Sequence, residues 1–463
     1  MTAEVPLRIA LLSYKGNPFC GGQGVYVRHL SRELGRLGHR VEVIGAQPYP
    51  VLDEAPGVTL TELPSLDLYR QPDPFRTPSR EEIRDWVDAL EVGTMWTGGF
   101  PEPLTFSLRA RRLLAARRGD FDVVHDNQTL GYGLLGGPRA IGAPLVTTVH
   151  HPITVDRRLE LAAAQDWKRR ASVRRWYGFT RMQKRVARRL PSVITVSGSS
   201  RDEIVTDLGV RPERIHVVPI GADVGLFSPD PSVPEVPGRI VTTSSADVPL
   251  KGLVHLVEAL AKVRTEQPHA HLVVVGKRAD DGPVAAAIER YGLGGAIRFV
   301  KGISDAELVD LVRGAEVACV PSLYEGFSLP AAEAMATATP LVATTGGAIP
   351  EVAGPDGETC LAVPPGDAGS LAVALGRLLQ DAELRRRLGA AGRARVLERF
   401  TWAAAAQGTA ERYRAAIEAA RGGTPRPAAG PPRTTARPPH AAAARAAAPG
   451  GGAARTAARA DTP

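Results

Sequence analysis

Cysteine is scarce in this 463-residue chain, which contains only Cys20, Cys319 and Cys360. Three widely separated cysteines argue against a disulfide framework and against a cysteine-based metal site. Long apolar runs are also missing, because no stretch reaches the roughly 18 residues of a membrane-spanning helix. The N-terminus has no basic stretch ahead of an apolar block, as a signal peptide would have. These absences predict a cytoplasmic protein.

Lysine is scarce too, with 7 lysines against 50 arginines, and the positive charge is unevenly distributed. The net charge is +8, but the stretch from Arg421 onward carries seven arginines and one acid, Asp461, and supplies +6 of it. The preceding 420 residues sum to only about +2, so a nucleic-acid partner for the folded part loses support. Residues 422–463 are mostly Ala, Pro, Gly and Arg, and we predict a disordered tail there.

The length favours two domains, because a single hydrophobic core stops growing at about 250–300 residues. Short β-branched and aliphatic runs alternate with helical patterns, which is typical of parallel α/β sheets. The predicted strands are residues 8–12, 41–44, 123–125, 145–148, 193–196 and 216–218, followed by 240–243, 271–275, 297–300, 318–320 and 340–343.

A stretch rich in Pro and Gly, residues 219–238, separates the two sets of strands. We therefore predict one domain at residues 1–220 and a second at residues 221–400. Residues 65–118 contain five prolines that interrupt the alternation of strands and helices, so an insertion beside the first domain is expected there. A helix at residues 401–421 is expected to cross back to the first domain.

A glycine-rich motif, GGQGVYV, occupies residues 21–27 after the first predicted strand. Gly22 and Gly24 would open a helix whose free backbone N–H groups can approach a phosphate closely. A tight turn that needs positive φ explains the glycines equally well. The spacing lacks the third glycine of the dinucleotide-binding fingerprint. The motif thus favours an anion site or a turn, and it does not indicate a dinucleotide cofactor.

A second motif, PSLYEGFSLPAAEAMA, occupies residues 321–336 directly after a predicted strand. Glu325 falls on a loop and Glu333 on the helix that follows, at the carboxyl end of a parallel strand. Open α/β sheets bind ligands at that end of their strands. Free amides at Ser328 and Leu329 can hold a diphosphate, and carboxylates accept hydrogen bonds from hydroxyl groups. The motif therefore indicates a site for phosphate and sugar groups.

Together, the E-x₇-E spacing, the N-terminal Gly-Gly-x-Gly and the IPEV stretch after Gly346 and Gly347 resemble the motifs of glycosyltransferase family 4. The resemblance covers roughly residues 7–415, and the segments GGQGVYVRHLSREL and VHHP resemble an actinobacterial subgroup. It implies the GT-B fold, in which two Rossmann-like domains with parallel sheets face each other. It also implies a retaining transferase that moves a hexose from a nucleotide-sugar donor without a metal or another cofactor. The acceptor, a sugar, a polysaccharide or a lipid-linked group, would be held mainly by the first domain.

The resemblance also assigns roles to residues of the second motif. Glu325 would contact the hydroxyl groups of the donor sugar near its reacting carbon, and Glu333 would hold the ribose hydroxyls. Phe327, Ser328 and Leu329 would line the sugar and the diphosphate through their backbone amides.

Two further residues match the family pattern. His150, in TTVHHP, matches a histidine at the donor sugar, and Lys251 matches a lysine that stabilises the leaving diphosphate. Six residues before Lys251 the family usually has an arginine, where this chain has Ser245. Lys277 follows a predicted strand and either replaces that arginine or is a solvated loop lysine.

Three alternative functions have weaker support. A metal-dependent transferase would need Asp-x-Asp at the end of a strand, whereas the Asp-Phe-Asp at residues 120–122 precedes one and is interpreted as a helix-strand junction. A nucleotide-sugar epimerase on the same architecture would release free sugar without an acceptor. A non-enzymatic nucleotide- or nucleic-acid-binding module would not need Glu325. No motif favours any of the three.

Residues 157–189 hold twelve Lys or Arg against Glu160 and Asp166, which gives a net charge of +10. Four large aromatic residues are interleaved with them: Trp167, Trp176, Tyr177 and Phe179. On a helix this composition suits an anionic membrane surface or an acidic acceptor, and a solvated helix face is the alternative. The segment favours peripheral association with the inner face of the plasma membrane.

Overall fold

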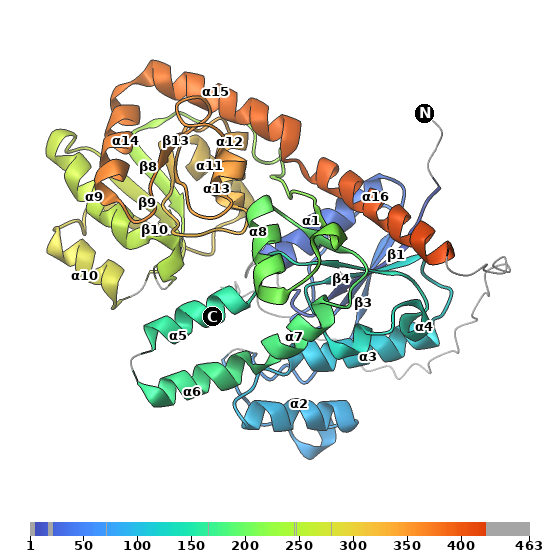
Figure 1. Ribbon diagram of the computed structural model, residues 1–463. Helices are drawn as coiled ribbons and strands as arrows, with labels where there is room; N and C mark the ends of the chain where they lie inside the picture. The colour runs from blue at the N-terminus through green and yellow to red at the C-terminus, as the bar shows by residue number, and fades with distance from the viewer. Residues whose placement is uncertain are drawn as a thin grey trace, which may run out of the picture.

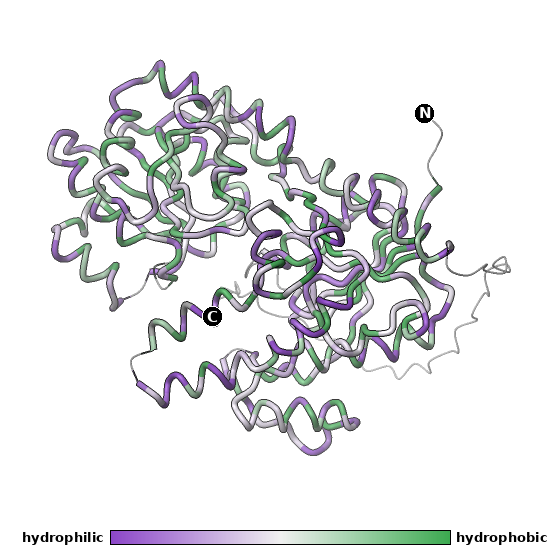
Figure 2. Tube along the Cα trace, in the orientation of Figure 1, coloured by the Kyte–Doolittle hydropathy of each residue, from purple (hydrophilic) through white to green (hydrophobic). Residues whose placement is uncertain are grey.

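The computed structural model describes residues 5–16, 22–70, 72–164, 166–244, 246, 248–278 and 280–422. Two sheets, each packed between helices, form two domains that lie side by side (Figure 1). Apolar segments gather on the strands inside each domain, and polar segments lie on outer helices (Figure 2). This arrangement confirms the GT-B fold class predicted from the motifs. Apart from Gly422, the predicted tail lies outside the described residues.

The first sheet has seven parallel strands in the order β3-β2-β1-β4-β5-β6-β7. Strands buried on both faces need continuous apolar or small residues, and the central strands β1, β4 and β5 are buried almost throughout. The sequence pattern does not predict β3, because most of its residues lie exposed or half-exposed at the sheet edge. The strands are β1 (Arg8–Ser13), β2 (Arg40–Gly45), β3 (Val58–Glu62), β4 (Val123–Asn127), β5 (Leu145–Thr148), β6 (Val193–Thr195) and β7 (Ile215–Val217).

Residues 65–118, which the sequence predicts to be an insertion beside the first domain, contain two helices of that domain, α2 and α3. The helices are α1 (Gly22–Arg36), α2 (Trp86–Trp96), α3 (Glu102–Ala116), α4 (Pro138–Ile141), α5 (Thr154–Ala163), α6 (Trp167–Trp176), α7 (Thr180–Ala187) and α8 (Gly198–Glu203). α3 buries Phe106, Ala110 and Leu114 in the core of the domain. Only α2 and its loops form a separate small cluster, so the added segment is smaller than the expected insertion.

The second sheet has six strands in the order β10-β9-β8-β11-β12-β13. The strands are β8 (Val236–Thr243), β9 (His271–Val275), β10 (Ile297–Val300), β11 (Ala315–Val320), β12 (Leu341–Thr344) and β13 (Leu361–Val363). The helices are η6 (Pro249–Lys251), α9 (Leu253–Glu266), α10 (Pro283–Arg290), α11 (Asp305–Arg313), α12 (Leu329–Ala336), α13 (Ile349–Ala353), α14 (Ala368–Gln380) and α15 (Ala382–Arg399). No helix within the described ranges is long and apolar enough to cross a membrane.

The chain passes between the domains twice, and the two crossings touch. The first follows β7, and the second joins α15 to α16 (Trp402–Arg421), which packs against α1 in the first domain. Ala222 N donates a hydrogen bond to Phe400 O at 3.0 Å. A Cβ on Gly221 would lie 2.4 Å from Phe400 O, so no larger residue fits at this crossing. The close approach forms a narrow hinge between the two domains.

A buried hydrogen-bond network ties α16 to the first sheet. Tyr413 and His125 are both fully buried, and Tyr413 Oη lies 2.6 Å from His125 Nδ1. His125 Nε2 lies 2.7 Å from Thr148 Oγ1, which is also 3.0 Å from Tyr26 Oη. Buried polar groups destabilise a fold unless they are paired, and these groups satisfy one another.

We expect Tyr413→Phe to lower the free energy of unfolding by about 1–3 kcal/mol, because it leaves a buried ring nitrogen of His125 without a partner. Urea denaturation measures the change. Tyr291→Phe is the matched control, since the Tyr291 side chain makes no hydrogen bond with the described residues and is 38% exposed. Equal stability of the two variants would show that α16 is held by apolar packing alone.

Candidate active site

The loops after β8 and β11 bring Lys251 and Glu325 together. These strands are parallel neighbours, so their carboxyl ends meet at one edge of the sheet. Lys251 Nζ lies 2.8 Å from Glu325 Oε1, and Ser322 Oγ donates to the same oxygen at 2.7 Å. Leu323 N donates to Leu250 O at 2.7 Å and holds the two loops side by side. Two residues predicted as catalytic are therefore in direct contact.

The loop that carries Glu325 also reaches the first domain. The carbonyl oxygen of Gly326 accepts hydrogen bonds from Ser197 Oγ at 2.7 Å and from Ser200 Oγ at 3.1 Å. A Cβ on Gly326 would lie 3.3 Å from His150 O, so the loop lies against the turn that follows β5. This contact places His150 beside the loop of Glu325, although the two residues belong to different domains.

His150 is held in a defined orientation by its neighbours. Its backbone N–H donates to Gln128 Oε1 at 2.6 Å, and its Nε2 lies 2.8 Å from Asn127 Oδ1. The Tyr26 ring packs edge-to-face against the imidazole, with the two ring centres 4.7 Å apart. Burial, with a smaller contribution from His151, lowers the pKa of His150 to about 3. The imidazole is therefore neutral at pH 7, which suits a hydrogen bond to a hydroxyl group rather than general acid catalysis.

Glu333 lies on α12, and its carboxyl group has no hydrogen-bond partner among the described residues. Burial, reinforced by the charge of Asp305, raises the pKa of Glu333 to about 8. Ser328, just before α12, has a φ of 102°, and its hydroxyl is buried without a partner. Strain and unpaired polar groups cost stability and often mark positions that bind a ligand. The start of α12 therefore has the character of a binding site.

Phe327 and Leu329 flank Ser328, and they differ in which of their groups a ligand can contact. The Phe327 ring packs edge-on against Phe400, with ring centres 5.7 Å apart, and is buried. Only its backbone is left for a ligand. Leu329 is the first residue of α12, where the first backbone N–H groups lack helical partners.

Among the described residues, no hydrogen bond or ion pair joins Gly22, Gly24 or Lys277 to the Lys251–Glu325 pair. Gly22 is the first residue of α1, and a Cβ there would meet no described atom within 4 Å. Gly24 is buried within the same helix, while residues 17–21 lie outside the described part of the chain. Lys277 O accepts a hydrogen bond from Ala246 N at 3.0 Å, next to the position where the family has its arginine. The roles of these three residues stay predictions.

Several polar residues of the site were not singled out in the sequence. Glu351, in the IPEV stretch, accepts hydrogen bonds from Gly198 N at 2.7 Å and from Ser199 N at 2.8 Å. Asn127 and Gln128, which orient His150, come at the end of a fully buried strand. Polar residues at that position are the signal that sequence reasoning missed, because the carboxyl ends of parallel strands face the ligand.

The described residues contain no group of three or more His, Cys, Asp or Glu side chains placed to hold a metal ion. In the Asp-Phe-Asp stretch, Asp122 pairs with Arg8 at 2.8 Å at the amino end of β4. The prediction that this stretch is a structural junction is confirmed.

Comparisons with known proteins bear on both domains. A model described as glycosyltransferase family 4 matches residues 20–226, and one described as glycosyl transferases group 1 matches residues 230–395. An MMP alpha-(1->4)-mannosyltransferase from Mycolicibacterium hassiacum is 56% identical over 412 residues, which cover 89% of this chain and 98% of that protein.

More distant similarity extends across the same length. A D-inositol 3-phosphate glycosyltransferase from Kineococcus radiotolerans is 29% identical and covers 90% of this chain and 98% of its own. The structure of a sucrose-phosphate synthase from Thermosynechococcus elongatus is 26% identical and superimposes with a TM-score of 0.67, covering 89% of this chain and 100% of that one. The epimerase and non-enzymatic alternatives have no counterpart among these matches. The chain belongs to glycosyltransferase family 4 and is a glycosyltransferase that uses a nucleotide-sugar donor.

Proposed function

We propose that this enzyme is a retaining α-(1→4)-mannosyltransferase that uses a nucleoside diphosphate mannose and needs no metal. The observation that carries the proposal is the 56% identity, across 98% of its length, to a protein with that named activity. The contact between Lys251 and Glu325 supports it, because it pairs a cation for the diphosphate with a carboxylate for the sugar.

In the proposed reaction, the bond between the anomeric carbon and the diphosphate oxygen breaks as an acceptor hydroxyl attacks from the same face. The acceptor oxygen forms the new bond, and its proton passes to the leaving diphosphate. Lys251 and the free amides at the start of α12 stabilise the negative charge that develops on the diphosphate. The neutral imidazole of His150 and the carboxylate of Glu325 hold the hydroxyl groups of the donor sugar. No metal ion is therefore needed to bind the sugar.

We place the acceptor on the first domain, near the carboxyl end of β1, where Lys15 lies over Phe100 in a cluster of five aromatic rings: Tyr69, Phe75, Phe100, Trp176 and Phe179. The centres of the Phe100 and Trp176 rings lie 5.2 Å apart, and Tyr69 lies 5.5 Å from Phe100. Glu102 lies beside this cluster with one carboxylate oxygen buried and unpartnered, and burial raises its pKa to about 7. Aromatic rings pack against the apolar faces of sugars, and a buried carboxyl group accepts hydrogen bonds from sugar hydroxyl groups. These features favour a neutral oligosaccharide acceptor over a phosphorylated one.

Incubation of the enzyme with nucleoside diphosphate mannose and a neutral α-(1→4)-mannooligosaccharide should give a product one mannose longer. The new linkage should be α by NMR, and turnover should survive EDTA because Lys251 and helix amides neutralise the leaving group. Inositol 3-phosphate offered as the acceptor should give far less product. Transfer only to inositol 3-phosphate, or activity that EDTA abolishes and manganese restores, would reject the acceptor class or the metal-free chemistry respectively.

At pH 9, where the Glu333 carboxylate is ionised, Glu333→Gln should weaken binding of the nucleoside diphosphate by roughly ten- to a hundredfold, because it removes the charged acceptor for the ribose hydroxyls. The pKa of Glu333 in the folded protein, about 8, exceeds its ordinary value of 4.5, so the wild type loses stability as the pH rises from 4.5 to 8. The variant should therefore melt at a higher temperature than the wild type at pH 8 and at an equal one near pH 4.

Calorimetry and thermal unfolding measure these two effects. Glu398→Gln, at an exposed position on α15, is the control and should change neither. Unchanged nucleotide affinity in Glu333→Gln would remove this carboxylate from the donor site.

Within the basic segment at residues 157–189, the end of α5 and all of α6 extend away from the first sheet, whereas α7 packs in the core of the first domain (Figure 1). Only Trp167 among its four large aromatic residues is well exposed, at 74%. Tyr177 is buried, and Trp176 and Phe179 pack against the domain core. Three of the four aromatic residues in the basic segment therefore anchor the end of α6 to the domain, and Trp167 is the one on its exposed surface. Val173 is the single buried residue of α6, so its basic residues line an exposed surface.

We propose that this exposed face of α6 docks on anionic lipid, as the charge pattern predicts. Changing Lys168, Arg169, Arg170 and Arg174 to Gln should strongly reduce co-sedimentation of the full chain with phosphatidylserine vesicles, since each charge is worth about 1 kcal/mol at such a surface. The matched control changes Arg40, Arg111, Arg290 and Arg386, which are exposed on other elements. Equal sedimentation of both variants would show that the basic residues of α6 do not bind the vesicles and that α6 is simply a solvated helix.

A further inference from the structure

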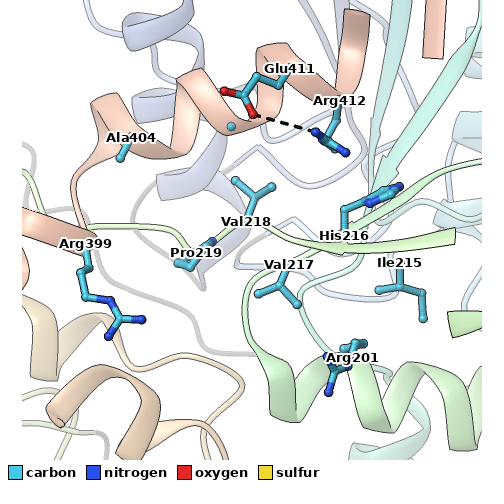
Figure 3. A pocket seen from close by; sticks show the side chains of 11 residues that line it. Arg201, Ile215, His216, Val217, Val218, Pro219, Arg399, Ala404, Glu411 and Arg412 are labelled. Carbon is cyan, nitrogen blue, oxygen red and sulfur yellow. Dashed lines mark ion pairs between the residues drawn. The ribbon is translucent and has the colours of Figure 1, made fainter. Parts of the chain in front are cut away.

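A cavity of about 450 Å³ lies outside the donor site, at the hinge where the chain passes between the domains (Figure 3). Its floor is formed by Val217, Val218 and Pro219 of the first crossing. Three arginines lie around this floor in Figure 3: Arg201 of α8, Arg399 at the end of α15 and Arg412 of α16. The walls therefore come from both domains.

Of the residues that line this hinge cavity, three are arginines and one, Glu411, is a carboxylate. Arg412 approaches only its neighbour Glu411, at 3.9 Å, which is too long for a hydrogen bond. Arg201 pairs with Asp202, the next residue in the chain, at 2.9 Å. Arg399 has no ion pair with any described residue, and its guanidinium carbon lies 5.8 Å from the centre of the Phe400 ring. Asp202 and Glu411 offset part of this charge, and the three arginines leave the cavity positive overall.

Titratable neighbours respond to this charge. Burial, followed by the charge of Arg412, lowers the pKa of His216, which lines the cavity. Burial, followed by the charge of Arg399, lowers the pKa of Arg395 on the same helix. Additional positive charge is thus unfavourable at His216 in the cavity wall, and an anion is favourable there.

We propose that the hinge cavity binds a small organic phosphate of the size of a phosphorylated monosaccharide. Guanidinium groups form charge-assisted hydrogen bonds with phosphate oxygens, which explains three arginines from three separate elements. The exposed valine floor, with Val217 at 38% exposure, packs against the carbon skeleton of such a ligand. Inorganic phosphate lacks that skeleton and should bind more weakly.

The position of Arg201 connects the hinge cavity to the donor site. It lies on α8 only three residues after Gly198, whose N–H group holds Glu351 of the second domain. The same helix holds Gly326, next to Glu325, through Ser200. A ligand that joins Arg201 to Arg399 therefore favours the arrangement in which the two domains are docked. Donor binding and phosphate binding should then strengthen each other by the same factor.

Calorimetry of the full chain with glucose 6-phosphate as the probe tests the site, with a nucleoside diphosphate present at saturation to fill the donor site. Wild type and Arg386→Gln should bind the probe equally, since Arg386 is exposed on α15 away from the cavity. The double variant Arg399→Gln, Arg412→Gln should bind it at least about tenfold more weakly, because two charge-assisted contacts are lost. Free glucose should not bind.

Absence of saturable binding in the wild type, or equal affinity in the double variant, would overturn the proposal. So would binding that the saturating nucleotide abolishes, because the probe would then occupy the donor site. The single variant Arg399→Gln, which removes only an exposed side chain, gives the same test if the double variant melts at a lower temperature. Mannosyl transfer without the probe should be unchanged in all three variants, which separates this proposal from the proposed transferase activity.

Discussion

Hydrogen bonds between the start of α8 and the second domain fix the distance between the two halves of the active site. The N–H groups of Gly198 and Ser199 lie at a helix start, where they have no helical partners and favour negative charge. The Glu351 carboxylate accepts from both, and Ser197 and Ser200 donate to Gly326 O beside it. His150 and Glu325 belong to separate domains, so their proximity depends on this docking.

Around this contact the site retains polar groups that the fold itself leaves unsatisfied. Glu333 has no partner among the described residues, Ser328 adopts a left-handed φ with a buried hydroxyl, and one oxygen of Glu102 is buried alone. Each of these features lowers stability, and a core built only for stability would replace them with apolar residues. Their position at the carboxyl ends of the strands is consistent with selection for binding at the expense of stability.

The two chain crossings between the domains determine where the domains can move relative to each other. The two crossings are held together by the contact between Ala222 and Phe400, and α16 then anchors the end of the second domain on the first sheet. Relative motion of the domains must therefore occur around one narrow point, next to the cavity lined by Arg201 and Arg399. A ligand at such a point acts on both domains at once.

The α/β class, most central strands and the E-x₇-E motif can be predicted from the amino-acid order, because burial on a parallel strand and the start of a helix leave local patterns. The position of the Asp-Phe-Asp stretch before its strand is predicted in the same way. The edge strand β3 left no such pattern, since an exposed strand needs no apolar run. The packing of the folded chain, in contrast, is what puts α3 in the core and turns most aromatic residues of the basic segment inward. The pairing of Lys251 with Glu325, 74 residues apart, and the capping of α8 by Glu351 follow from strand order and domain docking. Local patterns do not encode those contacts, because crossover connections and the fit between two separately folded surfaces determine them.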